Sequence, residues 1–374
     1  MKTIVISAVN LNRGGTLTIL RDCLAYLSSL VEEDGNYRVV ALVYKKELAD
    51  FPNIEYIETE WPKKLWINRL WYEYISMNKI SKEIGTIYLW LSLHDTTPNV
   101  VAERRAVYCH NPFPFYKWKW RELLFAPKIV LFALLSKFIY QKNIHQNDFV
   151  VVQQQWIKEA FKRLFHLSKE KVIIALPDVP NIEELSYDNV QIAKKEYTFV
   201  YAASANSHKN FEILCEAATI LNKEGLMNFK VYLTIGRKEN KYAAWLNKSW
   251  GTDNPSLQFV GFQDKESLFK LYANSNSLIF PSKIETWGLP ISEFSAYDRP
   301  MLLADLPYAH ETAAGAKQVA FFDPDSPEVL AAQMKRLIQG DVSFLDSVPD
   351  IQREAPITHS WAELFDILLE KEGK

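Results

Sequence analysis

Two glutamates eight positions apart mark the stretch of the sequence with the clearest chemical potential. Glu285 and Glu293 flank a Trp-Gly-Leu-Pro segment within residues 280–300. An apolar run before them predicts a strand, and Pro290 suits the first turn of a following helix. Carboxylates accept hydrogen bonds from paired hydroxyls, as sugars offer. The spacing therefore favours a sugar-binding site, although two exposed acids near a helix N-terminus would also be favoured there.

One lysine and two glycines are candidates for binding phosphate. Lys209 lies in "SANSHKN" (204–210), which follows a predicted strand and opens a helix. A lysine there can contact phosphate as a point charge, helped by the helix dipole. The alternative is a solvent-exposed lysine in the N-terminal turn of a helix, which would have the same sequence pattern. Gly14 and Gly15 lie between the first strand and the first helix, where backbone N–H groups can approach an anion. They lack the full dinucleotide or P-loop pattern, so a tight turn is the alternative.

Polar residues also end two predicted strands of the first half. His94 and Asp95 follow the run 87–93, and His110 ends the run 105–110. Carboxyl ends of parallel strands form the ligand-binding edge of such sheets. There Asp95 could orient an acceptor hydroxyl or take its proton, and His110 could donate a hydrogen bond. Alternatively, these residues cap strand ends and hold loops.

The elements that must position these residues follow an α/β pattern. Short β-branched runs alternate with helical segments from "KTIVIS" onward, which indicates parallel sheets with crossover helices. The series restarts after a polar stretch at 176–196, which we interpret as a linker. We predict two doubly wound Rossmann-like domains facing a cleft. The N-terminal domain would span 1–180, with a C-terminal helix at about 358–374 packing back on it, and the second domain would span 181–357.

Composition narrows the classes of function. The chain has 374 residues and a net charge of −2, which gives no global signature of nucleic-acid binding. Its 3 cysteines form no Cys-x-x-Cys, so neither a disulfide framework nor a structural zinc site is indicated. No apolar stretch reaches the roughly 20 residues that span a bilayer, and the N-terminal run is not typical of a signal peptide. We therefore expect a cytoplasmic protein.

Residues 259–311 resemble the GT-B fold retaining glycosyltransferases of family 4, with Glu285 and Glu293 as the E-x7-E motif. The resemblance implies a nucleotide sugar, UDP- or GDP-linked, held mainly by the second domain (181–357), and an acceptor bound by the first (1–180). Glu285 would contact the donor sugar hydroxyls, Glu293 the ribose hydroxyls and Lys209 the diphosphate. The resemblance further implies main-chain contacts to the donor from Trp287, Gly288 and Leu289, and an approach to the diphosphate by Gly14 and Gly15.

The phosphate site departs from the pattern of that family. Members often carry an arginine a few residues before the lysine, where this sequence has Ser204. Arg237, in "TIGR", is the candidate for a second cation. The family works without a metal, so we expect no metal and no other cofactor. The D-x-D pair Asp323 and Asp325 follows a strand and precedes a helix, where capping is the simpler role.

The resemblance also implies a way of transferring the sugar. His110 resembles the histidine that lies near the reacting sugar in the first domain of the family. Charge stabilisation on the leaving diphosphate and positioning of the acceptor would drive the reaction. We expect a front-face mechanism, in which an oxygen of the leaving phosphate takes the acceptor proton.

Two segments of the first half combine basic, aromatic and apolar residues. Residues 61–77 include Trp61, Trp66 and Trp71, and residues 117–142 set lysines and arginines around a Leu, Ile, Val and Phe core. Such composition fits a surface lying in an anionic lipid interface. The alternative is that these helices pack on the sheet of their own domain.

Together these features predict a retaining, metal-independent glycosyltransferase of the hexosyltransferase type. It would move a sugar from a nucleoside-diphosphate sugar to a lipid-linked or oligosaccharide acceptor in cell-surface polysaccharide biosynthesis. We expect it at the inner face of the cytoplasmic membrane as a peripheral protein. The alternatives are a GT-B transferase with a soluble small-molecule acceptor and a non-catalytic subunit that binds a sugar nucleotide.

Overall fold

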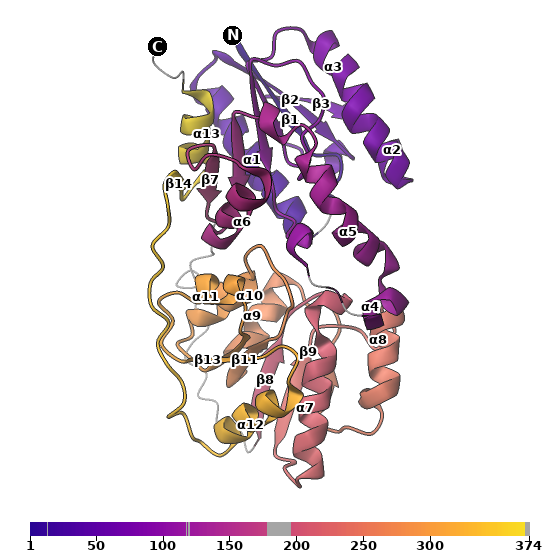
Figure 1. The fold of residues 1–374 in the computed structure, drawn as a ribbon, viewed down its shortest axis with the longest axis vertical. Coiled ribbons are helices and arrows are strands. Elements are labelled where there is room, and N and C mark those ends of the chain that lie inside the picture. The colour runs from indigo at the N-terminus through magenta and orange to yellow at the C-terminus, as the bar shows by residue number, and fades with distance from the viewer. Residues whose placement is uncertain (13, 117, 119, 178–195, 371–374) are drawn as a thin grey trace. The chain divides into compact units, whose positions relative to one another are not determined.

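The computed structural model describes residues 1–12, 14–116, 118, 120–177 and 196–370 (Figure 1). The chain divides into two compact units. Unit 1 comprises Met1–Pro114, Leu135–Asp178 and Arg353–Lys374, and unit 2 comprises Phe115–Leu134 and Val179–Gln352. The predicted linker lies outside the described residues from 178 to 195, as do the last four residues of the predicted C-terminal helix.

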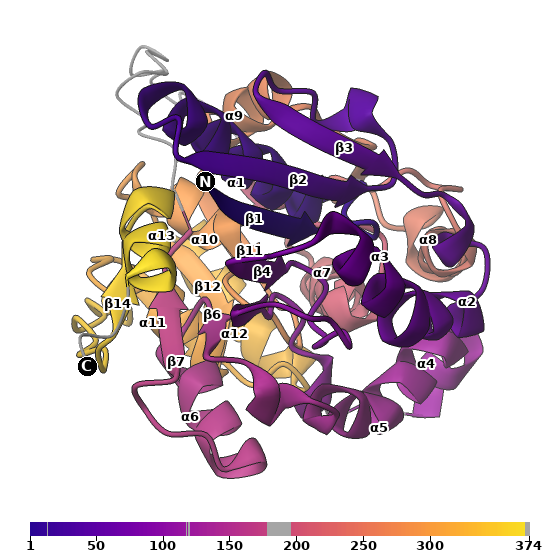
Figure 2. The same cartoon turned by 90° about the horizontal axis from the view of Figure 1, so that it is seen from above.

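Unit 1 is built on an eight-stranded sheet whose strand order is β14-β7-β6-β5-β4-β1-β2-β3. All of its recorded strand pairs are parallel, and Figure 2 shows β1, β2 and β3 side by side. The strands are β1 (Lys2–Ser7), β2 (Tyr37–Val43), β3 (Ile54–Glu58), β4 (Leu89–Ser92), β5 (Arg104–Tyr108), β6 (Phe149–Val152), β7 (Val172–Ala175) and β14 (Ile357–Thr358).

Helices cover both faces of this sheet. They are α1 (Gly14–Glu33), α2 (Trp66–Trp71), the π-helical turn η3 (Tyr72–Ser76), α3 (Met77–Ile84), α6 (Gln155–Phe165) and α13 (Trp361–Leu369). Ile4 of β1 shares a core cluster with Leu24 of α1 and Phe365 of α13. Val5 packs instead with Tyr72 of η3. Since successive strand residues point to opposite faces, α1 and α13 cover one face and η3 covers the other.

Unit 2 has a six-stranded parallel sheet in the order β10-β9-β8-β11-β12-β13. Its strands are β8 (Tyr197–Tyr201), β9 (Phe229–Leu233), β10 (Leu257–Phe259), β11 (Ser277–Phe280), β12 (Met301–Ala304) and β13 (Val319–Phe322). Its helices are α4 (Trp120–Phe125), η7 (Ser207–Lys209), α7 (Phe211–Lys223), α8 (Lys241–Leu246), η8 (Asn247–Gly251), α9 (Lys265–Ala273), α10 (Leu289–Ser295), α11 (Pro307–Thr312) and α12 (Pro327–Ile338). Helix α5 (Pro127–Gln141) spans the boundary between the units.

The predicted fold class of two doubly wound parallel sheets is confirmed. The pattern did not single out β3, β7 and α8, which are short. The structure also groups residues 115–134 with unit 2, whereas the sequence placed them in the first domain. The physical reason is aromatic packing, since the Phe125 ring of α4 lies 5.7 Å from that of Tyr242 and 4.7 Å from that of Trp245.

Helix α13 should contribute substantially to the stability of unit 1. Phe365 is fully buried and stacks on Tyr26 of α1, with ring centroids 5.4 Å apart. We expect Phe365→Ala to lower the free energy of unfolding by about 3–5 kcal/mol, because it removes a buried aromatic ring and leaves a cavity. Chemical denaturation would measure the loss. The exposed neighbour Asp366→Ala should stay within about 0.5 kcal/mol of the parent, and equal losses would contradict the assignment.

Candidate functional site

A lysine–glutamate ion pair joins two loops at the carboxyl edge of the unit 2 sheet. Strands β8 and β11 are neighbours, so the segments that follow them emerge side by side. The Nζ of Lys209 donates to the Glu285 carboxylate, and the two side chains are 16 % and 14 % exposed. The structure thus brings together two residues that lie 76 positions apart in the sequence.

Hydrogen bonds to the main chain hold both of these loops in place. The hydroxyl of Tyr201 donates to the carbonyl of Lys209 at 2.7 Å. The amide of Lys283 donates to the carbonyl of His208 at 2.8 Å, which ties the two loops directly. The hydroxyl of Tyr308 donates to the carbonyl of Ser282 at 2.7 Å. The positions of Lys209 and Glu285 are therefore set by buried contacts beneath them.

The turn between the two motif glutamates depends on a glycine. Gly288 has φ +92°, and a Cβ placed there would lie 3.4 Å from the side chains of Ile291 and Phe280. Both the left-handed backbone and the close packing disfavour any other residue. The indole of Trp287 donates to the hydroxyl of Ser292 at 2.8 Å, which fastens the turn to α10. Helix α10 begins at Leu289 with a proline in its first turn, as predicted.

Glu293 lies on α10 and is partly buried. It accepts a hydrogen bond of 3.1 Å from the hydroxyl of Tyr272. Burial raises the pKa of its carboxyl, and the hydrogen bond from Tyr272 only partly offsets this effect. A buried carboxylate with spare acceptor capacity suits a ligand that brings its own hydroxyl donors.

A second set of charges lies beneath the Glu285 loop. The Nζ of Lys283 lies 3.1 Å from Glu122 of α4 and 3.4 Å from Glu212 of α7, and all three side chains are largely buried. The Tyr116 ring packs edge-on against that of His208, 6.3 Å between centroids. Residues 115–125 of unit 2 therefore contact the neighbours of both Glu285 and Lys209.

The predicted second cation, Arg237, lies at the surface of unit 2. Arg237 follows β9 and is exposed, with Nη1 3.3 Å from the side-chain oxygen of Asn247 and its guanidinium over the Phe259 ring. Ser204, where the family pattern has an arginine, accepts a 2.8 Å hydrogen bond from Asn206. The diphosphate role of Arg237 stays a prediction.

The D-x-D pair forms a turn before α12. The amide of Asp325 donates to the Asp323 carboxylate at 2.9 Å, so Asp323 bonds within its own turn, while Ser326 takes the N-cap position of the helix. Among the residues that the structure describes, no group of three His, Cys, Asp or Glu side chains is arranged to hold a metal ion.

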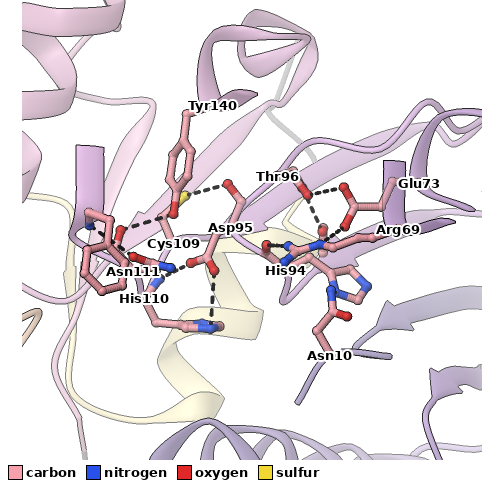
Figure 3. A network of polar contacts seen from close by, with 12 residues as sticks. Asn10, Arg69, Glu73, His94, Asp95, Thr96, Cys109, His110, Asn111 and Tyr140 are labelled. Atoms are coloured by element: carbon pink, nitrogen blue, oxygen red, sulfur yellow. Dashed lines mark hydrogen bonds and ion pairs between the residues drawn. The ribbon is translucent and has the colours of Figure 1, made fainter. Parts of the chain in front are cut away.

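In unit 1, Asp95 and His110 meet where β4 and β5 end (Figure 3). One carboxylate oxygen of Asp95 accepts the amide of His110 at 2.7 Å, and the other lies 3.5 Å from the Nε2 of the same residue. Asp95 is buried and has φ +69°, a conformation that non-glycine residues rarely adopt. The structure therefore brings these two predicted residues into direct contact.

His94 lies beside them but faces another part of the unit. Its Nδ1 is 3.3 Å from the side-chain nitrogen Nδ2 of Asn10, in the loop that leads to the glycine pair. Burial, with the nearby charge of Arg69, lowers the pKa of His94 well below its ordinary value, so its ring is neutral. Gly14 opens α1 with φ +60°, which requires a glycine-like backbone. The phosphate role of Gly14 and Gly15 stays a prediction.

Four residues around these sites were not predicted from the sequence: Arg69, Glu73, Glu122 and Lys283. The first two form an i, i+4 ion pair in "RLWYE", a spacing that the sequence does show. The other two belong to segments that lie far apart in the chain, so no local signal pairs them.

Comparison with known proteins identifies the second half of the chain. Residues 183–351 match the family model "Glycosyl transferases group 1". The chain is 26 % identical over 213 residues to O-antigen chain mannosyltransferase B of Escherichia coli, a match covering 54 % of this chain and only 55 % of that relative. It is 20 % identical over 271 residues to O-antigen chain mannosyltransferase RfbU of Salmonella typhimurium, covering 72 % and 70 %.

The fold agrees with this match. The structure of Anabaena Alr3699/HepE, solved in complex with UDP and glucose, superposes with a TM-score of 0.58 at 14 % identity, covering 93 % of this chain and 92 % of that one. The chain therefore shares the two-domain GT-B fold, and residues 183–351 are similar to the glycosyl transferases group 1 family.

The buried position of Glu293 should make the stability of unit 2 depend on pH. Because burial raises the pKa of this carboxyl in the folded protein, the unfolded chain gives up its proton first as the pH rises. As the pH rises, the free energy of unfolding then begins to fall near the pKa that the Glu293 carboxyl has in the unfolded chain. It stays lowered once the pH is above the pKa of this carboxyl in the folded protein. We expect Glu293→Gln, which can still accept from Tyr272, to raise the Tm at about pH 8 and to change it little at about pH 3.

Thermal melts at both pH values would measure this difference. The exposed Glu328, on α12 of the same unit, provides the control. Glu328→Gln should give no gain at either pH. A Glu293→Gln variant whose gain is the same at both pH values would show that the carboxyl does not carry the effect.

Proposed function

We propose that this chain is a retaining glycosyltransferase of family 4 that takes its sugar from a nucleoside diphosphate. The observation that carries the proposal is the Lys209–Glu285 ion pair, held at the carboxyl edge of a sheet in the domain that matches the glycosyl transferases group 1 model. Carboxyl edges of doubly wound sheets are where such folds bind ligands.

The pair has the chemistry that a sugar nucleotide requires. Lys209 and Glu285 are each largely buried, and each neutralises the other. A diphosphate would offer Lys209 a stronger anionic partner, and sugar hydroxyls would offer Glu285 neutral donors. Donor binding would thus replace one internal ion pair by two contacts to the ligand, without leaving an unpaired buried charge.

The remaining donor contacts follow from the arrangement around this pair. Glu293 would accept hydrogen bonds from the ribose hydroxyls, and the main-chain N–H groups of Trp287, Gly288 and Leu289 would bind the sugar and phosphate. Arg237 would supply the second cation. We propose that no metal takes part, since these groups offer cationic and N–H contacts for the leaving diphosphate.

The groups in unit 1 would act on the acceptor side. The bond between the anomeric carbon and the diphosphate oxygen breaks, and the acceptor oxygen bonds to the same face of that carbon. An oxygen of the leaving phosphate takes the acceptor proton. Asp95 would orient the acceptor hydroxyl and His110 would hydrogen-bond to the transferred sugar.

The acceptor class is proposed from the relatives. Two of them are named O-antigen chain mannosyltransferases. We therefore propose a glycan or lipid-linked acceptor of cell-surface polysaccharide synthesis and GDP-mannose as the first donor to test. A thermal-shift screen with GDP, UDP and their sugars would show the donor, since a ligand of the folded state raises its Tm by mass action.

Exposed apolar side chains support a peripheral contact with a membrane. In unit 1, residues 61–75 expose Trp61, Leu65, Trp66, Ile67, Trp71 and Ile75. In α5, the exposed apolar residues are Leu131, Leu134, Leu135 and Phe138. Within the described ranges, no helix is both long and apolar enough to cross a bilayer. We propose that these surfaces lie in the interface of an anionic membrane, at its inner face.

Substitution of the ion pair should separate its two roles. Lys209→Ala should weaken binding of GDP or UDP by about 10- to 100-fold, because it removes a charged hydrogen bond to the diphosphate. Glu285→Ala should leave binding of the free nucleotide unchanged or tighter, since it releases Lys209. The same variant should lower kcat/KM for transfer on the order of 100-fold or more. Calorimetric titration and an assay of nucleoside-diphosphate release would measure these effects.

The exposed pair Lys335–Glu224 of the same unit offers a matched control. Lys335→Ala should change neither nucleotide binding nor transfer. Unchanged nucleotide binding by Lys209→Ala would remove this lysine from the donor site. EDTA should not lower the rate of sugar transfer. A loss of transfer in EDTA would indicate that a metal ion takes part, with Asp323 and Asp325 as its candidate ligands.

The apolar surface of unit 1 should determine binding to vesicles. We expect a Trp66→Ser/Trp71→Ser double variant to lose most of its co-flotation with vesicles containing anionic lipid, because exposed aromatic side chains supply interfacial affinity. Its Tm should stay close to that of the parent, since both side chains are exposed. Full retention of flotation by the double variant would contradict the membrane assignment for this segment.

A further inference from the structure

The helix that carries this apolar surface also reaches inward to the polar network of unit 1. Arg69 of α2 and Glu73 of η3 form an ion pair of 2.8 Å, with side chains 24 % and 1 % exposed. The neighbours Trp66 and Trp71 on the same stretch are exposed. A short π-helical turn, a feature that often marks functional sites, begins directly before Glu73.

This ion pair holds the loop that contains Asp95. The Nη2 of Arg69 donates to the carbonyl of His94 at 2.8 Å, one residue before Asp95. The hydroxyl of Thr96 donates to the second carboxylate oxygen of Glu73 at 2.7 Å, one residue after it. Figure 3 shows Arg69 and Glu73 on one side of this loop and His110 on the other.

Asp95 needs such support because its backbone is strained. A left-handed backbone at φ +69° is uncommon for a residue other than glycine, and its cost in free energy is offset by surrounding contacts. The side chain of Asp95 in turn accepts the amide of His110 at 2.7 Å, and the thiol of Cys109 lies 3.7 Å from its carbonyl. The contacts of the two flanking residues and of the carboxylate together keep Asp95 in this conformation.

The electrostatics agree with this geometry. Burial lowers the pKa of Arg69, but the charge and hydrogen bond of Glu73 and the charge of Asp95 outweigh burial and raise it above its ordinary value. Arg69 is therefore charged, and its field extends to the Asp95 carboxylate.

We infer that Arg69 and Glu73 are positioning residues for the reaction, which hold Asp95 against His110 by clamping the residues on either side of Asp95. The inference rests on the proposed function for the roles of Asp95 and His110 in transfer. Neither Arg69 nor Glu73 would contact the reacting atoms. A displacement of about 1 Å in a reacting geometry can lower a rate on the order of 100-fold.

The test uses variants that separate positioning from stability. Removing only one partner would leave a buried charge unpaired and could prevent folding. The main variant is therefore Arg69→Met/Glu73→Met, which replaces the pair by apolar side chains of similar size. Arg69→Lys keeps the charge but lacks the planar fork that reaches both Glu73 and the His94 carbonyl. Thr96→Val removes only the bond from the loop to Glu73.

Arg104 provides a matched control in the same unit. Its Nη1 donates to the carbonyl of Leu368 at 2.8 Å, at the amino end of β5 and away from Asp95. Arg104→Met should lower the Tm without changing kcat. All variants would be assayed below their melting temperatures for release of nucleoside diphosphate from GDP-mannose or UDP-glucose, whichever stabilises the parent protein.

We expect the double variant to lower kcat on the order of 100-fold with little change in the donor KM, and Arg69→Lys and Thr96→Val to lose less. In a crystal structure of the double variant, the φ of Asp95 should move away from +69°, and the hydrogen bond from the His110 amide to the Asp95 carboxylate should be lost. A double variant that keeps both the Asp95 geometry and kcat would overturn the inference. If the parent protein binds no sugar nucleotide, the proposed function fails, while the crystal structure still decides whether the pair positions Asp95.

Discussion

The pairing of parallel strands is the constraint on which both candidate sites depend. Parallel neighbours bring their carboxyl ends to one edge, so residues that follow different strands meet there. The β8–β11 pairing places Lys209 beside Glu285, and the β4–β5 pairing places Asp95 beside His110. The chemistry of each site therefore depends on hydrogen bonds between main-chain groups elsewhere in the sheet.

Each site is then held in place by buried polar groups from outside its own strands. In unit 2, Lys283 joins Glu122 and Glu212 beneath the Glu285 loop. In unit 1, Arg69 and Glu73 hold both flanks of Asp95. Buried ion pairs contribute little net stability compared with apolar packing, but they specify position strongly. Their presence beside strained or charged residues is the arrangement that a preorganised site requires.

The apolar side chains of residues 61–77 and of residues 115–134 have different surroundings. Trp66 and Trp71 are exposed on α2, whereas Arg69 of the same helix forms an ion pair with the buried Glu73 of η3. In residues 115–134, part of the apolar content is used in packing, as Phe125 contacts Tyr242 and Trp245 of unit 2. Internal packing thus accounts for Phe125, whereas contact of the exposed Trp66 and Trp71 with lipid stays a prediction.

The sequence by itself determined the α/β class, the tandem sheets and the residues at the strand ends, because strand periodicity and helix signals are local. It also placed Pro290 in the first turn of α10. Only the tertiary structure decided that residues 115–134 group with unit 2 and that Lys283 pairs with Glu122, 161 positions away. It likewise decided that Arg69 and Glu73 clamp the Asp95 loop. These contacts join segments distant in the chain, and no local pattern encodes which distant partner a buried charge will find.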